Sequence, residues 1–537
     1  MPPTAAGGVA SGRWRHGRWT WGWLNQVRPR RLTAQAASDL ALVAFIVAGA
    51  IGLDLYHLAD TSLYLDEAMS AELALRPWGI TWGYLWGPED HMTLYYVLLH
   101  LWVQVTGVLG WAPTELILRL PSILFAAAAA TVLYLLGRRC WSRTAALLAT
   151  TLYLLNPLQL FHAQKARSYS LQLLLLCLAW YALFAILAGL PRQRWWWLLF
   201  GVAMTLALYA QPFSALVLAS QLAAYGVYLV VPGPWRPHAR QGLRALVVTL
   251  AASGAAVVPL LIDVHLHGQS NQFVPPASLS AIGNILLLGT SDTLLLVAVL
   301  VVVCLAGIAL VALPRLSGIA RGVAPGNPTV QPRGSRLAAF ERVRPGVLAL
   351  LCWLCVPLIL SFGLTQPALN LHLFWWRYLV VVVPPLCLLA GIAVAALRWT
   401  PLRLALGLLL VVVALPKAVA YYPTAQLTDW RSSSQWVERH YQVGDGVICV
   451  LSLGCSAPLQ YYFQAYPGPA TLTADAPGNW IWAHHRAIPI DPGTIARYAA
   501  QHARVFLVVS SYGSSGDTVA GAQQARTWLD THEQLLA

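Results

Sequence analysis

The sequence predicts a polytopic α-helical membrane protein of about 11 spans that continues into a C-terminal α/β domain. The 537-residue chain is 58% hydrophobic and only 10% charged, a balance that soluble globular proteins do not approach. Apolar runs long enough to cross a bilayer recur over residues 37–420. From residue 421 the composition changes, and alternating apolar stretches at 446–453 and 504–510 indicate strands between helices.

The basic excess indicates membrane topology rather than nucleic-acid binding. The chain has 34 Lys and Arg against 20 Asp and Glu, a formal charge of +14, and most basic residues lie in short loops beside apolar runs. Lys and Arg collect on the cytoplasmic side of membrane proteins. We therefore expect a multi-pass protein of the cell membrane, with the Arg- and Trp-rich segment 1–36 in the cytoplasm, no removable signal peptide and no nucleic-acid partner.

Loop charges also set the order of the spans. The first outer segment, 56–115, contains an apolar stretch at 94–109, which we place along the outer interface. If it crossed, Arg138, Arg139 and Arg143 would lie outside, against the charge rule. The loop 314–346 is expected inside because it holds six Arg against one acid. The predicted spans are 37–55, 116–136, 145–161, 171–190, 195–209, 213–231, 245–262, one ending near Leu313, 347–364, 378–397 and 404–420.

An odd number of spans places the domain 421–537 on the extracytoplasmic side. Cys449 and Cys455 then lie in an oxidising space, where they form a disulfide or remain two buried thiols. A separation of six residues is not diagnostic, and thiols are the favoured interpretation. Three Trp residues of this domain fit a core or a sugar platform equally well, and we assign no site residue to it: Trp430, Trp436 and Trp480.

Two acidic groups stand in the first outer segment. Asp66 and Glu67 open an interfacial helix, where they stabilise its start through the helix dipole or serve a site, since a surface carboxylate can act as general base. Glu89 and Asp90 precede His91, which lies at headgroup level or in an active site. The spacing permits a divalent cation without demanding one. We predict no metal site and no cofactor.

Three basic residues lie on the outer side, where the charge rule disfavours them. Lys165 and Arg167 occupy the short loop 162–170, and Arg377 ends an outer loop among aromatic residues. A phosphate in the outer leaflet would account for them, because guanidinium presents forked donors to phosphate oxygens. The alternative is that the Arg side chains extend to the headgroups from an aromatic belt.

The ordered set of motifs resembles the bacterial GT-C membrane glycosyltransferases related to protein O-mannosyltransferases and to the lipid A aminoarabinose transferase. The matching pieces cover the N-terminal two fifths well and the rest thinly. They are Leu65-Asp66-Glu67-Ala68, His91-Met92-Thr93-Leu94-Tyr95-Tyr96-Val97-Leu98-Leu99-His100, Arg119-Leu120-Pro121-Ser122, Ala166-Arg167-Ser168-Tyr169-Ser170-Leu171, Arg377-Tyr378 and Asp429-Trp430-Arg431.

The resemblance implies a GT-C fold and inverting transfer of a hexose, mannose-like, from a polyprenyl-phosphate donor to a protein, glycan or lipid acceptor at the bilayer. It implies Asp66 as catalytic base with Glu67 shaping the acceptor site. The remaining assignments are Arg167, Arg377 and Lys165 for the donor phosphate and His91, Tyr95 and Tyr169 for substrate.

Two departures from the family pattern bear on metal dependence. Lys165 stands where an acid is usual, and His91-Met92-Thr93-Leu94 replaces His-Pro-Pro-Leu. Both favour metal independence. The alternative function is a lipid-linked glycan transporter or a non-catalytic lipid-sugar-binding protein. Such proteins place charges in mid-span, whereas here polar residues cluster at outer ends, which favours an interfacial enzyme.

Overall fold

The computed structural model describes most of the chain. The described residues are 34–87, 91–231, 233–267, 277–291, 293–299, 301–302, 336–369, 371–450, 453–466, 468–509, 516–532 and 534. Glu89, Asp90, the N-terminal residues 1–33 and most of the predicted loop 314–346 therefore lie outside them. The chain divides into two units, Met1–Phe45 and Ile46–Ala537, and apart from the start of the first helix the features discussed below lie in the second.

Long apolar helices dominate the described residues. Seven are long and apolar enough to cross a membrane, or eight if one bent pair counts as a span. They include α5 (Glu115–Cys140), α8 (Tyr169–Leu187), α11 (Arg236–His267), α15 (Arg336–Leu364), α16 (Val383–Ala395) with η3 (Tyr378–Val382), α17 (Thr400–Tyr421), and α1 (Ala34–Leu55). The predicted 11 spans are not confirmed, and the one ending near Leu313 falls largely outside the described residues.

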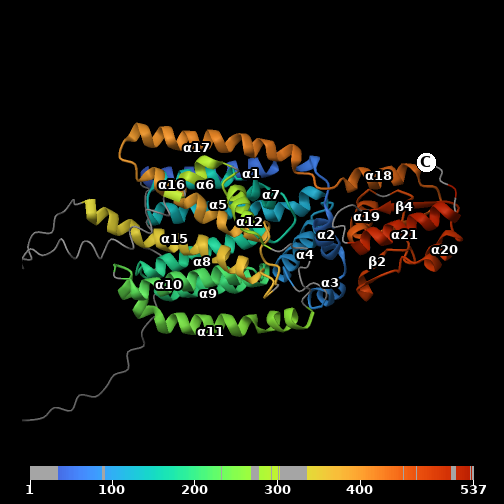
Figure 1. Ribbon diagram of the computed structural model, residues 1–537, viewed down its shortest axis with the longest axis horizontal. Coiled ribbons are helices and arrows are strands. Elements are labelled where there is room, and N and C mark those ends of the chain that lie inside the picture. Colours follow the sequence, from blue (N-terminus) through green and yellow to red (C-terminus); the bar gives the residue numbers. More distant parts are fainter. Residues whose placement is uncertain are drawn as a thin grey trace, which may run out of the picture. The chain divides into compact units, whose positions relative to one another are not determined.

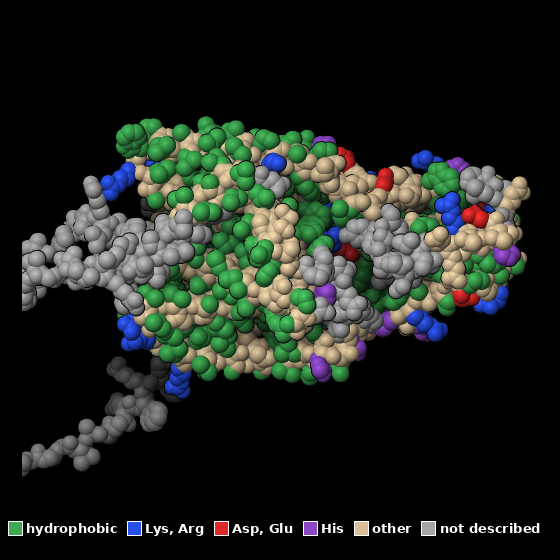
Figure 2. Space-filling model, in the orientation of Figure 1, with side chains coloured by type: hydrophobic (Ala, Val, Ile, Leu, Met, Phe, Trp, Pro, Cys, Tyr) green, Lys and Arg blue, Asp and Glu red, His purple; other side chains and the backbone are tan. Residues whose placement is uncertain are grey.

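The remaining helices complete the packing around these. Helix α8 packs against α5 and α9 (Gln193–Ala210), and α10 (Ser214–Val230) packs against α15 (Figure 1). Hydrophobic side chains are frequent over the long helices on the face seen in Figure 2. Leu404 and Leu408 of α17 and Val247 of α11 are each more than half exposed. Exposed apolar side chains on long helices suit contact with lipid.

The predicted span 145–161 is broken in the structure. Helix α6 (Arg143–Leu154) and α7 (Pro157–Ala163) meet at a bend of 65°. Asn156 starts α7 because its side chain accepts hydrogen bonds from the amides of Leu158 and Gln159, and Pro157 has no amide hydrogen to extend α6. The bend turns the chain toward the loop that carries Lys165 and Arg167.

Three α-helices follow one another in the first outer segment, and one of them begins beside Asp66, where the sequence predicted a helix start. Helix α2 (Leu65–Leu75) has Asp66 and Glu67 in its first turn, where the dipole favours acids. Helix α3 (Trp78–Leu85) follows Pro77, and α4 (Thr93–Val108) packs against α2. The apolar stretch predicted to lie at the interface forms α4, a helix of 16 residues.

Residues beyond 421 contain both predicted strands. Strand β1 (Gly446–Val450) pairs in parallel with β4 (Val505–Val509), with Gly446 opposite Val505. The short β2 (Trp480–Ile481) and β3 (Arg486–Ala487) are antiparallel. Ile448, Ile495 and Tyr498 form part of a buried core. The helices here are α18 (Trp430–His440), α19 (Leu453–Ala465), α20 (Pro492–Ala499) and α21 (Gly516–His532), with the short η5 (Trp482–His484).

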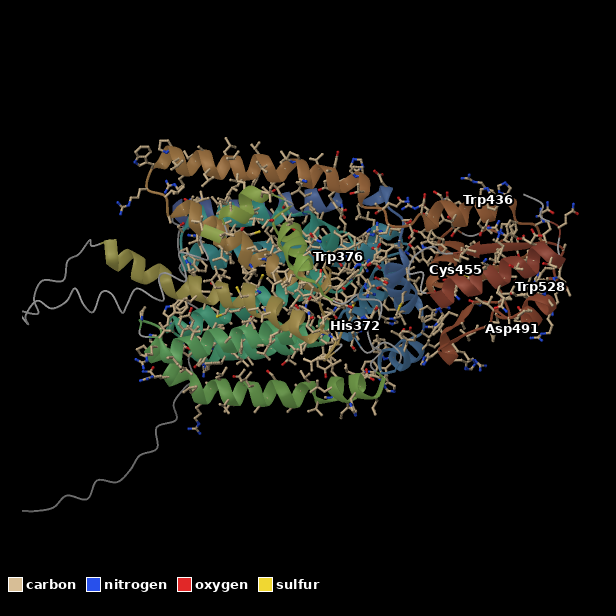
Figure 3. The ribbon with its side chains drawn as sticks, in the orientation of Figure 1. His372, Trp376, Trp436, Cys455, Asp491 and Trp528 are labelled. Carbon is tan, nitrogen blue, oxygen red and sulfur yellow. A yellow bond between two sulfur atoms is a disulfide. The ribbon has the colours of Figure 1, made fainter. Side chains whose placement is uncertain are left out.

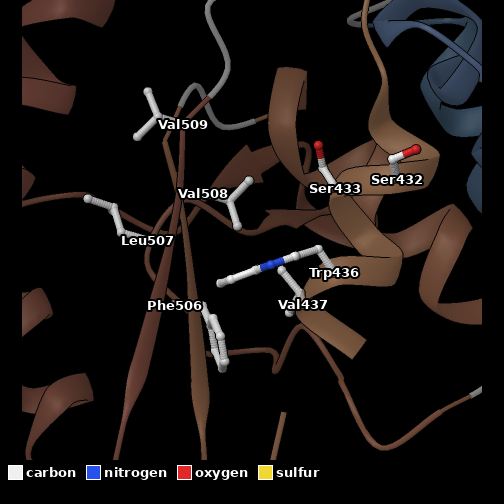
Figure 4. Close-up of a pocket in the computed structure, with 8 residues that line it drawn as sticks. All are labelled: Ser432, Ser433, Trp436, Val437, Phe506, Leu507, Val508 and Val509. Carbon is white, nitrogen blue, oxygen red and sulfur yellow. The ribbon is translucent and has the colours of Figure 1, made fainter. Parts of the chain in front are cut away.

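The three Trp residues left unassigned lie in different surroundings. Trp430 is buried and Trp480 half-buried, whereas Trp436 is 48% exposed. Trp436 lines an open groove between α18 and β4 together with Ser432, Phe506 and Val508 (Figure 4).

Cys449 and Cys455 are joined by a disulfide, so the favoured interpretation as two thiols is wrong. The end of β1 and the first turn of α19 bring the two side chains together, an approach that sequence spacing does not encode; Cys455 is labelled in Figure 3.

Closing a loop this short stabilises a fold by about 2 kcal/mol through the entropy of the unfolded chain. We expect replacement of both Cys by Ser to lower the unfolding free energy by that amount, measured by denaturant titration of purified protein. Equal stability with and without reductant would contradict this.

Polar contacts join the first outer segment to the residues beyond 421. The Tyr462 hydroxyl accepts a hydrogen bond from the Leu63 amide at 2.7 Å and lies 3.1 Å from Glu115 Oε1. Arg431 Nε also donates to Glu115, at 2.9 Å. Helix α19 packs along α2, and Arg76 at the end of α2 donates to Gln460 Oε1 at 2.8 Å. Residues beyond 421 therefore contact the first outer segment both before and after Asp66.

Candidate active site

Asp66 and Arg377 form an ion pair across 311 residues of sequence. Arg377 Nη1 donates to Asp66 Oδ2 at 2.7 Å, and the two side chains are 11% and 27% exposed. The guanidinium lies 5.2–5.9 Å from the ring centres of Tyr64, Phe161 and Trp376, a distance at which cation–π attraction holds it in place. The carboxylate is thus oriented and still reachable.

Arg167 approaches Asp66 from a second direction. Its Nη1 lies 3.2 Å from the Asp66 carbonyl oxygen and 3.4 Å from Ser70 Oγ. The same nitrogen donates to the Tyr96 hydroxyl at 2.9 Å. The structure therefore brings together Asp66, Arg167 and Arg377. Asp66 lies at the start of α2, Arg167 in the loop before α8 and Arg377 in the loop before η3.

Glu67 points away from Asp66 into a fully buried network. Arg119 donates to both of its carboxylate oxygens at 2.8 Å, and the Ala166 amide donates to Oε1 at 2.9 Å. Lys165 Nζ lies 3.7 Å from Oε2. Burial raises the pKa of Glu67, but the charges of Arg119 and Lys165 outweigh it and the pKa is lowered from its ordinary value. Glu67 thus fixes the loop that carries Arg167.

Lys165 sits in the same network at a cost to stability. Burial lowers its pKa to about 8, although Glu67 opposes this shift. A lysine whose folded pKa is below its unfolded value is destabilising while charged, and this penalty disappears as the pH rises from about 8 toward 10.5. We therefore expect the stability of wild type, relative to that of Lys165→Met, to increase as the pH rises across that window. Thermal unfolding of both proteins at a series of pH values measures this. Parallel curves for the two proteins would contradict this.

Three predicted substrate residues occupy different positions. Tyr95 points to α5, where its hydroxyl lies 2.9 Å from Ser122 Oγ, and it is buried. Tyr169 begins α8, with its ring 4.2 Å from that of His162. His91 is half-buried just before α4. The tyrosine that contacts Arg167 is Tyr96, not the predicted Tyr95, because consecutive helical residues face about 100° apart. The sequence analysis did not assign Tyr96.

Several of the buried polar atoms that have no hydrogen-bond partner in the described residues lie beside this site. Within the described residues they include both ring nitrogens of His162, the Arg167 Nε and the Ser168 hydroxyl. His162 and Ser168 are fully buried, and Ser168 immediately precedes α8. Unsatisfied buried donors are rare, and a helix N-terminus with a guanidinium favours an anion. Sequence reasoning missed His162 and Ser168, although both lie in the loop it selected.

No group of three or more His, Cys, Asp or Glu suited to a metal occurs among the described residues. Glu89 and Asp90 lie outside them. Metal independence therefore stays a prediction.

Comparison with known proteins finds a family match over part of the chain. A family model described as dolichyl-phosphate-mannose-protein mannosyltransferase matches residues 90–262. This match confirms the resemblance to the GT-C membrane glycosyltransferases. Its range includes Arg119, Lys165 and Arg167, whereas Asp66 and Arg377 lie outside it. None of the curated protein sequences matches this chain.

Three solved structures are similar to the chain over most of its length. ArnT from Cupriavidus metallidurans bound to undecaprenyl phosphate has 14% identity and a TM-score of 0.48, over 92% of this chain and 96% of that one. AglB from Archaeoglobus fulgidus, in complex with an inhibitory peptide and a dolichol-phosphate, has 13% identity and a TM-score of 0.45, over 81% and 60%. The arabinofuranosyltransferase AftD from Mycobacteria has 17% identity and a TM-score of 0.45, over 81% and 33%.

Proposed function

We propose that this chain transfers a hexose, mannose-like, from a polyprenyl-phosphate donor to an acceptor hydroxyl outside the cytoplasm, with inversion at the anomeric carbon. The observation that carries the proposal is the Asp66 carboxylate, partly exposed and oriented by Arg377 beside Arg167. A carboxylate suits the removal of a hydroxyl proton, and two guanidinium groups suit a phosphate. The family match supports sugar transfer as the reaction class.

In the proposed reaction Asp66 accepts the proton of the acceptor hydroxyl as that oxygen attacks the anomeric carbon. The bond from this carbon to the phosphate oxygen breaks, and its electron pair stays on the phosphate. Attack from the face opposite the phosphate inverts the anomeric configuration. Arg167 and Arg377 stabilise the charge that develops on the leaving phosphate, and holding both substrates at the site removes much of the entropic barrier.

The groups without partners near α8 support the placement of the phosphate. His162, Ser168 and the Arg167 Nε are buried donors beside the start of a helix, an arrangement that phosphate oxygens would satisfy. Lys165 adds positive charge from its place next to Glu67. Glu67 acts in this proposal through what it holds, Arg119 and the Ala166 amide, rather than by touching the acceptor.

The proposed orientation places the N-terminus in the cytoplasm and the residues beyond 421 outside. The Cys449–Cys455 disulfide supports this, because such bonds persist in oxidising compartments. The contacts of Tyr462 and Arg431 with Glu115 support placing the residues beyond 421 on the same side of the membrane as Asp66.

A direct transfer measurement tests the proposal. Membranes containing the full chain are incubated with a panel of radiolabelled hexosyl polyprenyl phosphates, and label is followed into protein, glycan and lipid fractions. We expect transfer from at least one donor, with an inverted linkage, and none with membranes lacking the chain. Movement of the donor between leaflets without transfer would instead favour the transporter.

A further inference from the structure

Six charged side chains surround the start of α2, and we call them the charge cluster. They are Asp66, Glu67, Arg119, Lys165, Arg167 and Arg377. Its formal charge is positive by two with both carboxylates ionised. Glu67 is enclosed by Arg119, the Ala166 amide and Lys165. Asp66, 27% exposed, is the carboxylate whose partner can change.

Charge moves through this cluster in the proposed reaction. A sugar phosphodiester carries one negative charge, and the departing polyprenyl phosphate is a monoester that carries nearly one more at neutral pH. Asp66 loses its negative charge when it takes the acceptor proton. The total charge of cluster and ligand is therefore unchanged, while one negative charge is transferred from Asp66 to the phosphate.

We propose, building on the function above, that Arg377 exchanges partners during transfer. It pairs with the Asp66 carboxylate before the reaction and with the leaving phosphate after it. The rings of Tyr64, Phe161 and Trp376 hold the guanidinium in place, so the exchange needs no large movement. Arg167 keeps its place throughout, because its contacts are the Asp66 carbonyl oxygen and the Tyr96 hydroxyl, neither of which changes charge.

The exchange makes a specific prediction about product binding. Asp66→Asn imitates the protonated side chain, so it leaves Arg377 without a competing carboxylate. Purified full-length Asp66→Asn protein is therefore expected to bind radiolabelled undecaprenyl phosphate about tenfold more tightly than wild type, even though it does not catalyse transfer. Binding of undecaprenol, which has no phosphate, should not differ between the two proteins.

A double-mutant cycle shows whether the gain passes through Arg377. In an Arg377→Gln background, Asp66→Asn should improve undecaprenyl phosphate binding by less than about twofold. Arg377→Lys, which keeps a cation, should give an intermediate gain and serves if the Gln variant does not fold. Arg497→Gln, at an exposed position of α20, is the matched control and should preserve the full tenfold gain.

Three results would overturn the exchange: no gain in Asp66→Asn, an equal gain with and without Arg377, or a gain shared by undecaprenol. Any of these alongside active wild-type protein rejects the exchange and leaves the glycosyltransferase in place. A wild-type protein that neither transfers sugar nor binds undecaprenyl phosphate rejects the proposed function itself.

Discussion

Replacing Asp66 by Asn is expected to reduce sugar transfer by at least about 100-fold, because a positioned general base contributes that factor or more. The amide oxygen of Asn can still accept a hydrogen bond from Arg377, so the local structure should be retained. What is lost is the group that takes the acceptor proton. The measurement is the initial rate of transfer at equal protein in membranes, with donor and acceptor saturating.

Asp475→Asn provides the matched control, since Asp475 is exposed and lies beyond residue 421. It should transfer at the wild-type rate. If Asp66→Asn is as active as wild type, Asp66 is not the base. A rise in KM with kcat unchanged, measured by varying the donor and acceptor concentrations, would assign Asp66 to binding rather than to proton transfer.

Replacing Glu67 by Gln is expected to have the largest effect on stability, about 3–5 kcal/mol, because it leaves Arg119 as a buried charge without a carboxylate. Both side chains have no exposed surface. Unfolding of purified protein in detergent, monitored against denaturant, measures the loss. Glu115→Gln is the matched control: its partner Arg431 is 24% exposed, so the loss there should be clearly smaller.

The same carboxylate should make stability depend on acid pH. The folded pKa of Glu67 is lowered by Arg119 and Lys165 although burial opposes the shift. The stabilisation that ionised Glu67 provides is therefore fully present above its pKa in the unfolded chain. It is lost as the pH falls through its pKa in the folded protein. Wild type and Glu67→Gln should converge in stability as the solution is acidified. A difference that stays constant down to low pH would contradict this, because it would mean that Glu67 titrates alike in the folded and the unfolded protein.

Local sequence rules anticipated most of the long apolar helices that the structure describes and the start of α2, since these depend on apolar length and on acids near a helix N-terminus. They also identified Lys165, Arg167 and Arg377 as basic residues in need of an explanation. They could not pair Arg377 with Asp66, because a contact across 311 residues is set by packing rather than by spacing. The partner of Lys165 proved to be Glu67, which had been expected at the acceptor.

The break in the predicted span 145–161 had a sequence signal that apolar periodicity does not detect. Asn156-Pro157 is a helix-start pattern inside an apolar run, and it accounts for the break between α6 and α7. The disulfide required the end of β1 to meet α19, which a six-residue separation neither demands nor forbids.

The attachment of the residues beyond 421 to the first outer segment limits how such proteins can be recombined. Tyr462 and Arg431 both contact Glu115, and Gln460 accepts from Arg76 on the helix that starts at Asp66. A chimera that exchanged only the C-terminal part between homologues would place foreign side chains against α2. The two surfaces should therefore be exchanged together, and pairs such as Arg76 and Gln460 are where compensating substitutions are expected to coevolve.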